Sequence, residues 1–105
     1  EAEFPGNMTA IWDEHFGFVM QEELGHVLIG EFGIRDQEGS EGRATLWFDA
    51  FTDYMGVDYS WTYWSLNPNS YDTGGILQDD WVSVHDWKLE ALRPLMAPMI
   101  GSGAD

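Results

Sequence analysis

The sequence predicts an α/β fold built on two parallel strands that are joined by an amphipathic helix. Residues 26–31 form a nearly continuous apolar run, which is typical of a strand buried on both faces beneath helices. A second stretch, at residues 58–66, is rich in aromatic and β-preferring side chains. Glu31 and Trp64 are 33 positions apart, the length of one β-α-β unit. A right-handed crossover would place the two strands parallel and side by side.

The first predicted element is a helix over residues 7–23, which precedes the strand at 26–31. Asn7 or Thr9 can cap its start, and Gly25 is expected to end it. Its apolar residues recur at helical spacing: Trp12, Phe16, Val19 and Met20.

The crossover helix is predicted over residues 42–55, after the polar, glycine-containing stretch IRDQEGSEG. Gly56 is a natural stop for this helix. Its apolar face comprises Ala44, Trp47, Phe48, Phe51, Tyr54 and Met55. The strand at 58–66 follows directly.

After the second strand the sequence predicts a loop and then a final helix. The loop, NPNSYDTGG, has the composition of tight turns. The Asp79–Asp80 pair is the expected helix cap, Pro94 and Pro98 end the helix, and residues 101–105 are expected to form a flexible tail. Four residues of this helix are expected to face inward: Trp81, Val84, Trp87 and Leu89.

The charge balance is strongly acidic, with 19 Asp and Glu against four Lys and Arg and a formal net charge of −15. Such a surface repels phosphate backbones and anionic lipids, so we expect neither a nucleic-acid nor a membrane partner. There is no cysteine and therefore no thiolate zinc site. We expect no metal and no cofactor, because the histidines lack metal-ligand spacing and the oxygen-rich NPNSYD lacks the regular spacing of an EF-hand loop.

Glu31 is the candidate functional residue that the predicted topology brings forward. It stands at the carboxyl end of an apolar strand, where α/β sheets and barrels place binding and catalytic groups. A single Glu after a strand, taken alone, more often opens a solvated loop. Parallel pairing would bring Trp64 to the same rim, and this juxtaposition favours a functional role over the solvated loop.

Several motifs of the chain match one enzyme family. They are VLIGEFG, then WTYWSLNPNSYDTGGIL, then DDW and the closing LRPLMAPMI, with FPGNM and IWDEHFGF upstream. GEFG alone is a weak signal, but together with WTYWS and DTGG at this distance the match is specific. The chain resembles, over nearly its whole length, the final part of the family 5 glycoside hydrolases in the endo-β-1,4-glucanase (cellulase) branch.

This resemblance implies a (β/α)8 TIM barrel that cleaves β-glucan or cello-oligosaccharides with retention of configuration, in a secreted, extracellular protein. It implies that Glu31, at the end of the seventh strand, is the nucleophile. Trp64, at the end of the eighth strand, would be the sugar-stacking platform, followed by a cis peptide bond to Ser65. Further implied substrate-binding residues are Asn67, Tyr71 and Asp72, with Tyr71 standing where the family's loop usually has Gly.

A barrel of this class takes about 250 residues, so the 105 residues here are expected to hold only the C-terminal portion of the catalytic domain. This portion corresponds to about two β-α units and a preceding helix. The family's acid/base Glu on the fourth strand is absent from it, and Asp72 is the nearest substitute by topology. We therefore expect the chain to be incomplete on its own and to need the rest of the barrel, or association of several copies, for activity.

A non-catalytic carbohydrate-binding or structural role is the alternative. Trp61, Tyr63 and Trp64 could stack on sugar rings without catalysis. Alternation along the strand places Trp61 and Tyr63 on one face and Thr62 and Trp64 on the other, and core packing is the expectation for Trp61. Oligosaccharide binding without hydrolysis would favour this alternative.

Overall fold

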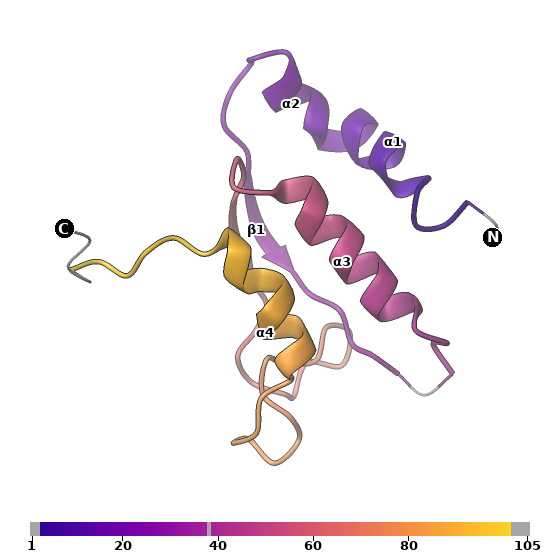
Figure 1. The fold of residues 1–105 in the computed structure, drawn as a ribbon, viewed down its shortest axis with the longest axis vertical. Helices are drawn as coiled ribbons and strands as arrows, with labels where there is room; N and C mark the ends of the chain where they lie inside the picture. Colours follow the sequence, from indigo (N-terminus) through magenta and orange to yellow (C-terminus); the bar gives the residue numbers. More distant parts are fainter. Residues whose placement is uncertain (1–2, 38, 102–105) are drawn as a thin grey trace.

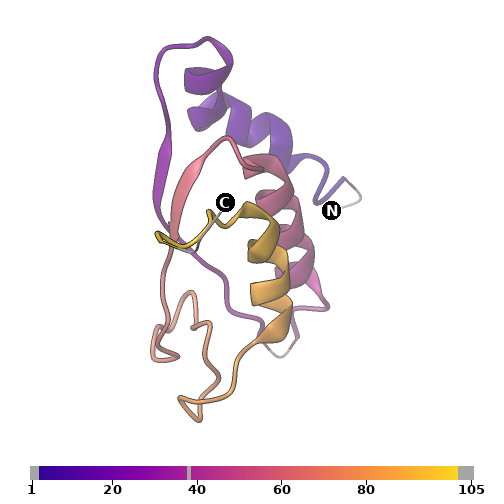
Figure 2. The ribbon, with the colours of Figure 1, turned by 60° about the vertical axis from the view of Figure 1, so that its left-hand side comes forward.

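Two parallel strands, covered on one side by helices, form the centre of the protein (Figures 1 and 2). The computed structural model describes residues 3–37 and 39–101. Figure 2 shows the strands along one side of the molecule and the two longer helices along the other. The bounds of these elements are β1 (Leu28–Phe32), α3 (Arg43–Met55), β2 (Ser60–Tyr63) and α4 (Asp86–Leu92).

The parallel pairing predicted from the sequence is confirmed. Leu28 is the partner of Ser60, and Ile29 is the partner of Trp61, in a parallel register. Helix α3 is the crossover between the two strands, as the 33-residue spacing indicated. Strand β1 begins two residues later and ends one residue later than predicted, and β2 covers only the central part of the predicted 58–66.

The N-terminal helix is continuous but irregular and stops before Gly25. It consists of α1 (Met8–Trp12), the π-helical turn η1 (Asp13–Gly17) and α2 (Phe18–Gln21). The chain leaves the helix through Glu23, whose φ is +55°, while the N–H of Leu24 donates to the carbonyl of Val19 at 2.8 Å. This 6→1 hydrogen bond is a C-cap that normally uses glycine at the left-handed position, so Gly25 was the wrong stop.

Gly17 has a steric role inside this helix. A Cβ at Gly17 would collide with the hydroxyl oxygen of Tyr54 on α3. The Tyr54 hydroxyl donates a hydrogen bond of 2.6 Å to the Asp13 carboxylate, which joins the N-terminal helix to α3. Burial and this hydrogen bond raise the pKa of Tyr54. Gly17 is therefore needed for the close approach of the N-terminal helix to Tyr54 of α3, and not for a turn.

Helix α3 provides half of the buried apolar cluster. Its N-cap residue Gly42 has φ +78°, and Gly56, the predicted stop, has φ +51°. The buried cluster consists of Trp12, Phe32, Phe48, Phe51, Met55 and Leu92. No helix in the described part of the chain is both long and apolar enough to cross a membrane.

The last helix begins later than predicted. Asp79 and Asp80 do not cap a helix, because the Asp80 carboxylate accepts hydrogen bonds from the backbone N–H groups of Val82 and Ser83 and closes a tight turn instead. The hydroxyl of Ser83, which donates to the same carboxylate at 2.6 Å, and these two N–H groups lower the pKa of Asp80. Trp81, expected to face inward, has φ +63° and is 52% exposed. Of the predicted tail at 101–105, all but Gly101 lies outside the described residues.

One face of the sheet is uncovered, which corrects the expectation of a strand buried on both faces. Leu28 of β1 is 62% exposed, whereas Phe32 is buried against the helices. The protein is a flat slab of 47 × 43 × 20 Å with a radius of gyration of 15.1 Å, against about 13 Å for a compact domain of this length. The apolar residues of β1 are suited to a strand covered on both faces, but residues 3–37 and 39–101 cover only one of them.

We expect residues 1–105, produced alone, to self-associate or to unfold without a sharp transition. The reason is that the sheet has two strand edges and an exposed apolar face, which must be covered for stability. Sedimentation velocity combined with urea denaturation measures both properties. A monodisperse monomer of 11.9 kDa with cooperative unfolding would contradict this expectation.

Candidate active site

The pairing of β1 with β2 is irregular at Glu31. Ile29 pairs with Trp61 and Phe32 with Tyr63, so β1 holds one residue more than β2 between these pairs. Such a bulge re-aims side chains and is common next to active sites. Here it lets both Ile29 and Phe32 pack on the core, while Glu31 stays exposed. The hydroxyl of Thr62 donates to the carbonyl of Gly30 and holds the bulge in place.

Trp64 lies at the same end of the sheet as Glu31, as parallel pairing predicted. Its N–H donates to the carbonyl of Phe32 at 2.8 Å, and its side chain is 52% exposed. The backbone of Trp64 packs so closely on Gly33 that a Cβ at Gly33 would collide with the Trp64 carbonyl oxygen. The Trp64–Ser65 peptide bond is cis, as the resemblance implied.

Residues 65–76, which we term the rim loop, follow Trp64 and carry the other three predicted substrate-binding residues. The base of the loop is closed by two backbone hydrogen bonds, from Ile76 N–H to Ser65 O at 3.0 Å and from Leu77 N–H to Leu66 O at 3.1 Å. All three side chains are exposed: Asn67, Tyr71 and Asp72. The structure therefore brings the rim loop and Trp64 together at one edge of the molecule.

Lys88 of α4 holds the rim loop in place through hydrogen bonds, a role that the sequence did not predict. Its side chain is 1% exposed, and its Nζ donates to the carbonyls of Thr73 at 3.1 Å and Gly75 at 2.9 Å. The Tyr63 ring lies 5.4 Å from the same Nζ. Burial, and to a lesser extent the guanidinium of Arg35, lowers the pKa of Lys88 to about 8. Its burial could have been predicted from its spacing, because Lys88 lies four residues before buried Leu92 and therefore on the same face of α4.

Trp61 and Tyr63 are partly buried and pack against the core cluster, which confirms the core packing expected for Trp61. Both rings make edge-to-face contacts with Phe32, at centroid distances of 5.8 and 5.5 Å. Burial raises the pKa of Tyr63 to about 12. Of the three aromatic residues considered for sugar stacking on β2, Trp64 is therefore the one with an exposed ring.

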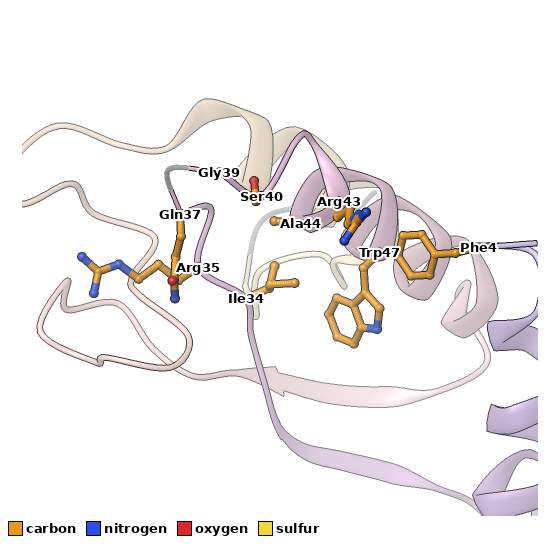
Figure 3. A pocket seen from close by; sticks show the side chains of 9 residues that line it. All are labelled: Phe4, Ile34, Arg35, Gln37, Gly39, Ser40, Arg43, Ala44 and Trp47. Carbon is orange, nitrogen blue, oxygen red and sulfur yellow. The ribbon is translucent and has the colours of Figure 1, made fainter. Parts of the chain in front are cut away.

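A pocket of about 440 Å³ lies beside the rim, between the loop after β1 and the start of α3 (Figure 3). It contains none of the predicted site residues. Figure 3 shows that the guanidinium of Arg35 extends away from Trp47 and Arg43 instead of pointing into the pocket. The lining residues are Phe4, Ile34, Arg35, Gln37, Gly39, Ser40, Arg43, Ala44 and Trp47.

An acidic side chain and a half-exposed tryptophan lie at the carboxyl ends of adjacent parallel strands, the position at which α/β-barrel enzymes carry their active-site groups. The family model described as "Cellulase (glycosyl hydrolase family 5)" matches residues 1–70. The chain belongs to this family of glycoside hydrolases. Its two strands and their helices are accordingly part of a TIM barrel.

Known relatives agree with this assignment. The chain is 43% identical to an endoglucanase of Paenibacillus polymyxa over 100 residues, which are 92% of this chain and 24% of that protein. It is 48% identical to the major extracellular endoglucanase of Xanthomonas campestris, covering 90% of this chain and 19% of that protein. It superposes with a TM-score of 0.80 on an endocellulase of Pyrococcus horikoshii in complex with cellotetraose, at 42% identity, covering 90% and 26% of the two chains. The chain thus spans about a quarter or less of the relatives it matches.

These relatives allow the chain to be studied in a complete barrel. We define the chimaeric barrel as the Paenibacillus polymyxa endoglucanase in which this chain replaces the matched residues. The two segments are 43% identical over 100 residues, which cover 92% of this chain.

In the chimaeric barrel, the free energy of unfolding should rise between pH 8 and about 10 because of Lys88. An unfolded lysine has a pKa of about 10.4, against about 8 when folded. In this window the unfolded state binds more protons, so stability increases with pH, by up to about 1.4 kcal/mol per pH unit. Urea denaturation at several pH values measures the slope.

The variant Lys88→Met should remove this rise in stability. Arg93→Met, which removes an exposed cation near the end of the same helix, serves as the matched control and should keep the slope. An unchanged pH dependence in Lys88→Met would show that Lys88 titrates as an ordinary lysine.

Proposed function

We propose that the chain supplies the nucleophile and the sugar-stacking platform of a retaining endo-β-1,4-glucanase. The observation that carries this proposal is the exposed Glu31 carboxylate, held by a bulge at the carboxyl end of β1, beside the half-exposed Trp64 at the end of β2. Groups at the ends of the strands on this face of a barrel perform the chemistry in enzymes of the class. The proposal is supported by the endoglucanase names of the relatives.

Retaining hydrolysis defines what Glu31 does. An ionised carboxylate attacks the anomeric carbon and forms a glycosyl ester, while a second carboxyl group protonates the leaving oxygen. The second group then removes a proton from water, which hydrolyses the ester. The two carboxyl groups must lie about 5 to 5.5 Å apart. We propose that the second carboxyl group comes from another barrel strand, with Asp72 of the rim loop as the alternative within this chain.

The proposed substrate is a β-glucan or cello-oligosaccharide. Trp64 offers an aromatic face for a pyranose ring, and Asn67 and Asp72 offer polar groups for its hydroxyls. The cellotetraose bound to the Pyrococcus horikoshii endocellulase supports this substrate class. We also propose that the protein is secreted, which is in keeping with the name of the extracellular Xanthomonas campestris relative.

Glu31→Gln in the chimaeric barrel should abolish hydrolysis of a soluble β-glucan, with a loss of at least about 10³-fold in kcat, because the amide keeps the shape but cannot attack. Binding of cellotetraose, measured by calorimetry, should change little. Glu90→Gln, an exposed glutamate on α4, is the matched control and should keep wild-type turnover. A 2-fluoro glycoside should label Glu31 covalently in the wild type.

Two results would decide against this function. Near-normal turnover in Glu31→Gln, or a covalent label on another residue, would remove Glu31 from the nucleophile role. A chimaeric barrel that binds cellotetraose but does not hydrolyse glucan would instead favour the carbohydrate-binding alternative, with Trp64 as its stacking residue.

A further inference from the structure

We propose that Tyr71 and Arg35 together form an additional sugar-binding platform on the rim, which makes the enzyme prefer longer glucan chains. This inference rests on the proposed function, because it places a subsite beyond the one formed by Trp64. The two residues come from different loops, Arg35 from the loop after β1 and Tyr71 from the rim loop.

Tyr71 is an aromatic side chain at an unusually open position. Its side chain is 77% exposed, more than that of Trp64 at 52%. A large ring left in water contributes little to folding, whereas an exposed aromatic face is suited to the apolar face of a pyranose.

Arg35 holds the Tyr71 ring in position. The Cζ of Arg35 lies 5.9 Å from the centroid of the ring, within the range of a cation–π contact. The stem of Arg35 packs on the rim loop, where its Cγ lies 3.5 Å from the place a Cβ would occupy on Gly74. Figure 3 shows the guanidinium projecting out of the neighbouring pocket, and Arg35 is exposed, so its N–H donors lie at the surface beside the ring. The pair thus combines an aromatic face with hydrogen-bond donors.

The segment that carries Tyr71 is held by its own hydrogen bonds. The N–H of Gly74 donates to the carbonyl of Ser70 at 2.9 Å, and the hydroxyls of Ser70 and Thr73 are 2.6 Å apart. The carbonyl of Thr73 also accepts from buried Lys88. Tyr71 therefore lies within a turn that hydrogen bonds close, and little loop entropy is lost when a ligand binds.

The charge of the protein selects the kind of ligand. With a net charge of −15 the surface disfavours anions, although Arg35 is a cation. One exposed ring with a guanidinium beside it fits an uncharged, polyhydroxylated ligand such as the next glucose units of the chain.

The test compares cello-oligosaccharides of increasing length in the chimaeric barrel. Tyr71→Ala should lower kcat/KM on the order of tenfold for the longest oligomers, through a higher KM. The shortest hydrolysed oligomer should be unaffected in both kcat and KM. Tyr71→Phe should restore the wild-type preference, because it keeps the ring, and Tyr71→Gly should behave like Tyr71→Ala.

Arg35→Gln should weaken the length preference partly, because it removes the cation but leaves Tyr71 in place. Phe18→Ala removes another partly exposed ring, from α2, and is the control for a general loss of aromatic surface. It should leave the length preference intact. Equal loss on short and long oligomers in Tyr71→Ala, or no loss on either, would overturn the platform.

A wild-type chimaeric barrel without hydrolytic activity would contradict the proposed function but still test the platform. In that case calorimetric titration with cellotetraose and cellohexaose replaces kinetics. Tighter binding of the longer oligomer, lost in Tyr71→Ala and kept in Tyr71→Phe, would support the platform. Equal binding of both oligomers by the wild type would overturn it.

Discussion

The contact of one ring, Phe32, with both layers is the constraint on which the rest of the structure depends. Phe32 is the last residue of β1, and it is 7% exposed. Its ring meets α3 and β2 at centroid distances of 5.3 to 6.3 Å, through Phe48, Phe51, Trp61 and Tyr63. Because Phe32 must face the helices, the bulge before it is needed to bring Ile29 to the same side, and Glu31 is left on the open edge. Core packing therefore sets the position of the acidic side chain.

The sequence was sufficient for the strand order, the crossover and the shared rim. Helical spacing of the apolar residues defined α3, and Gly56, with its positive φ, ended it as expected. A crossover of this length leaves parallel pairing as the simplest topology. Glu31 and Trp64 then meet at one edge for a geometric reason, since carboxyl ends of parallel strands coincide. No knowledge of side-chain contacts was required for these features.

Other features depend on contacts that a linear pattern does not contain. Asp80 is a good helix cap by composition, but the same carboxylate geometry closes a turn, and the two outcomes differ only in the backbone that follows. The bulge at Glu31 follows from the demands of Phe32 in three dimensions. Lys88 is charged and would be expected in solvent. It is buried because its ammonium group donates hydrogen bonds to two loop carbonyls and lies near the rings of Tyr63 and Trp87. The exposed face of β1 was not predicted either, because an apolar sequence indicates burial without showing which segment covers the strand.

The half exposure of Trp64 has a spectroscopic consequence. Indole emission shifts to shorter wavelength when water around the ring is replaced by apolar groups, and Trp12, at 6% exposed, already emits from such an environment. A sugar that covers Trp64 would dry a ring that is 52% exposed when free. Trp81, exposed to the same extent on a separate turn, provides a constant red-emitting background. The rim therefore carries its own optical reporter of occupancy, readable without a label and independent of whether the bound chain is cleaved.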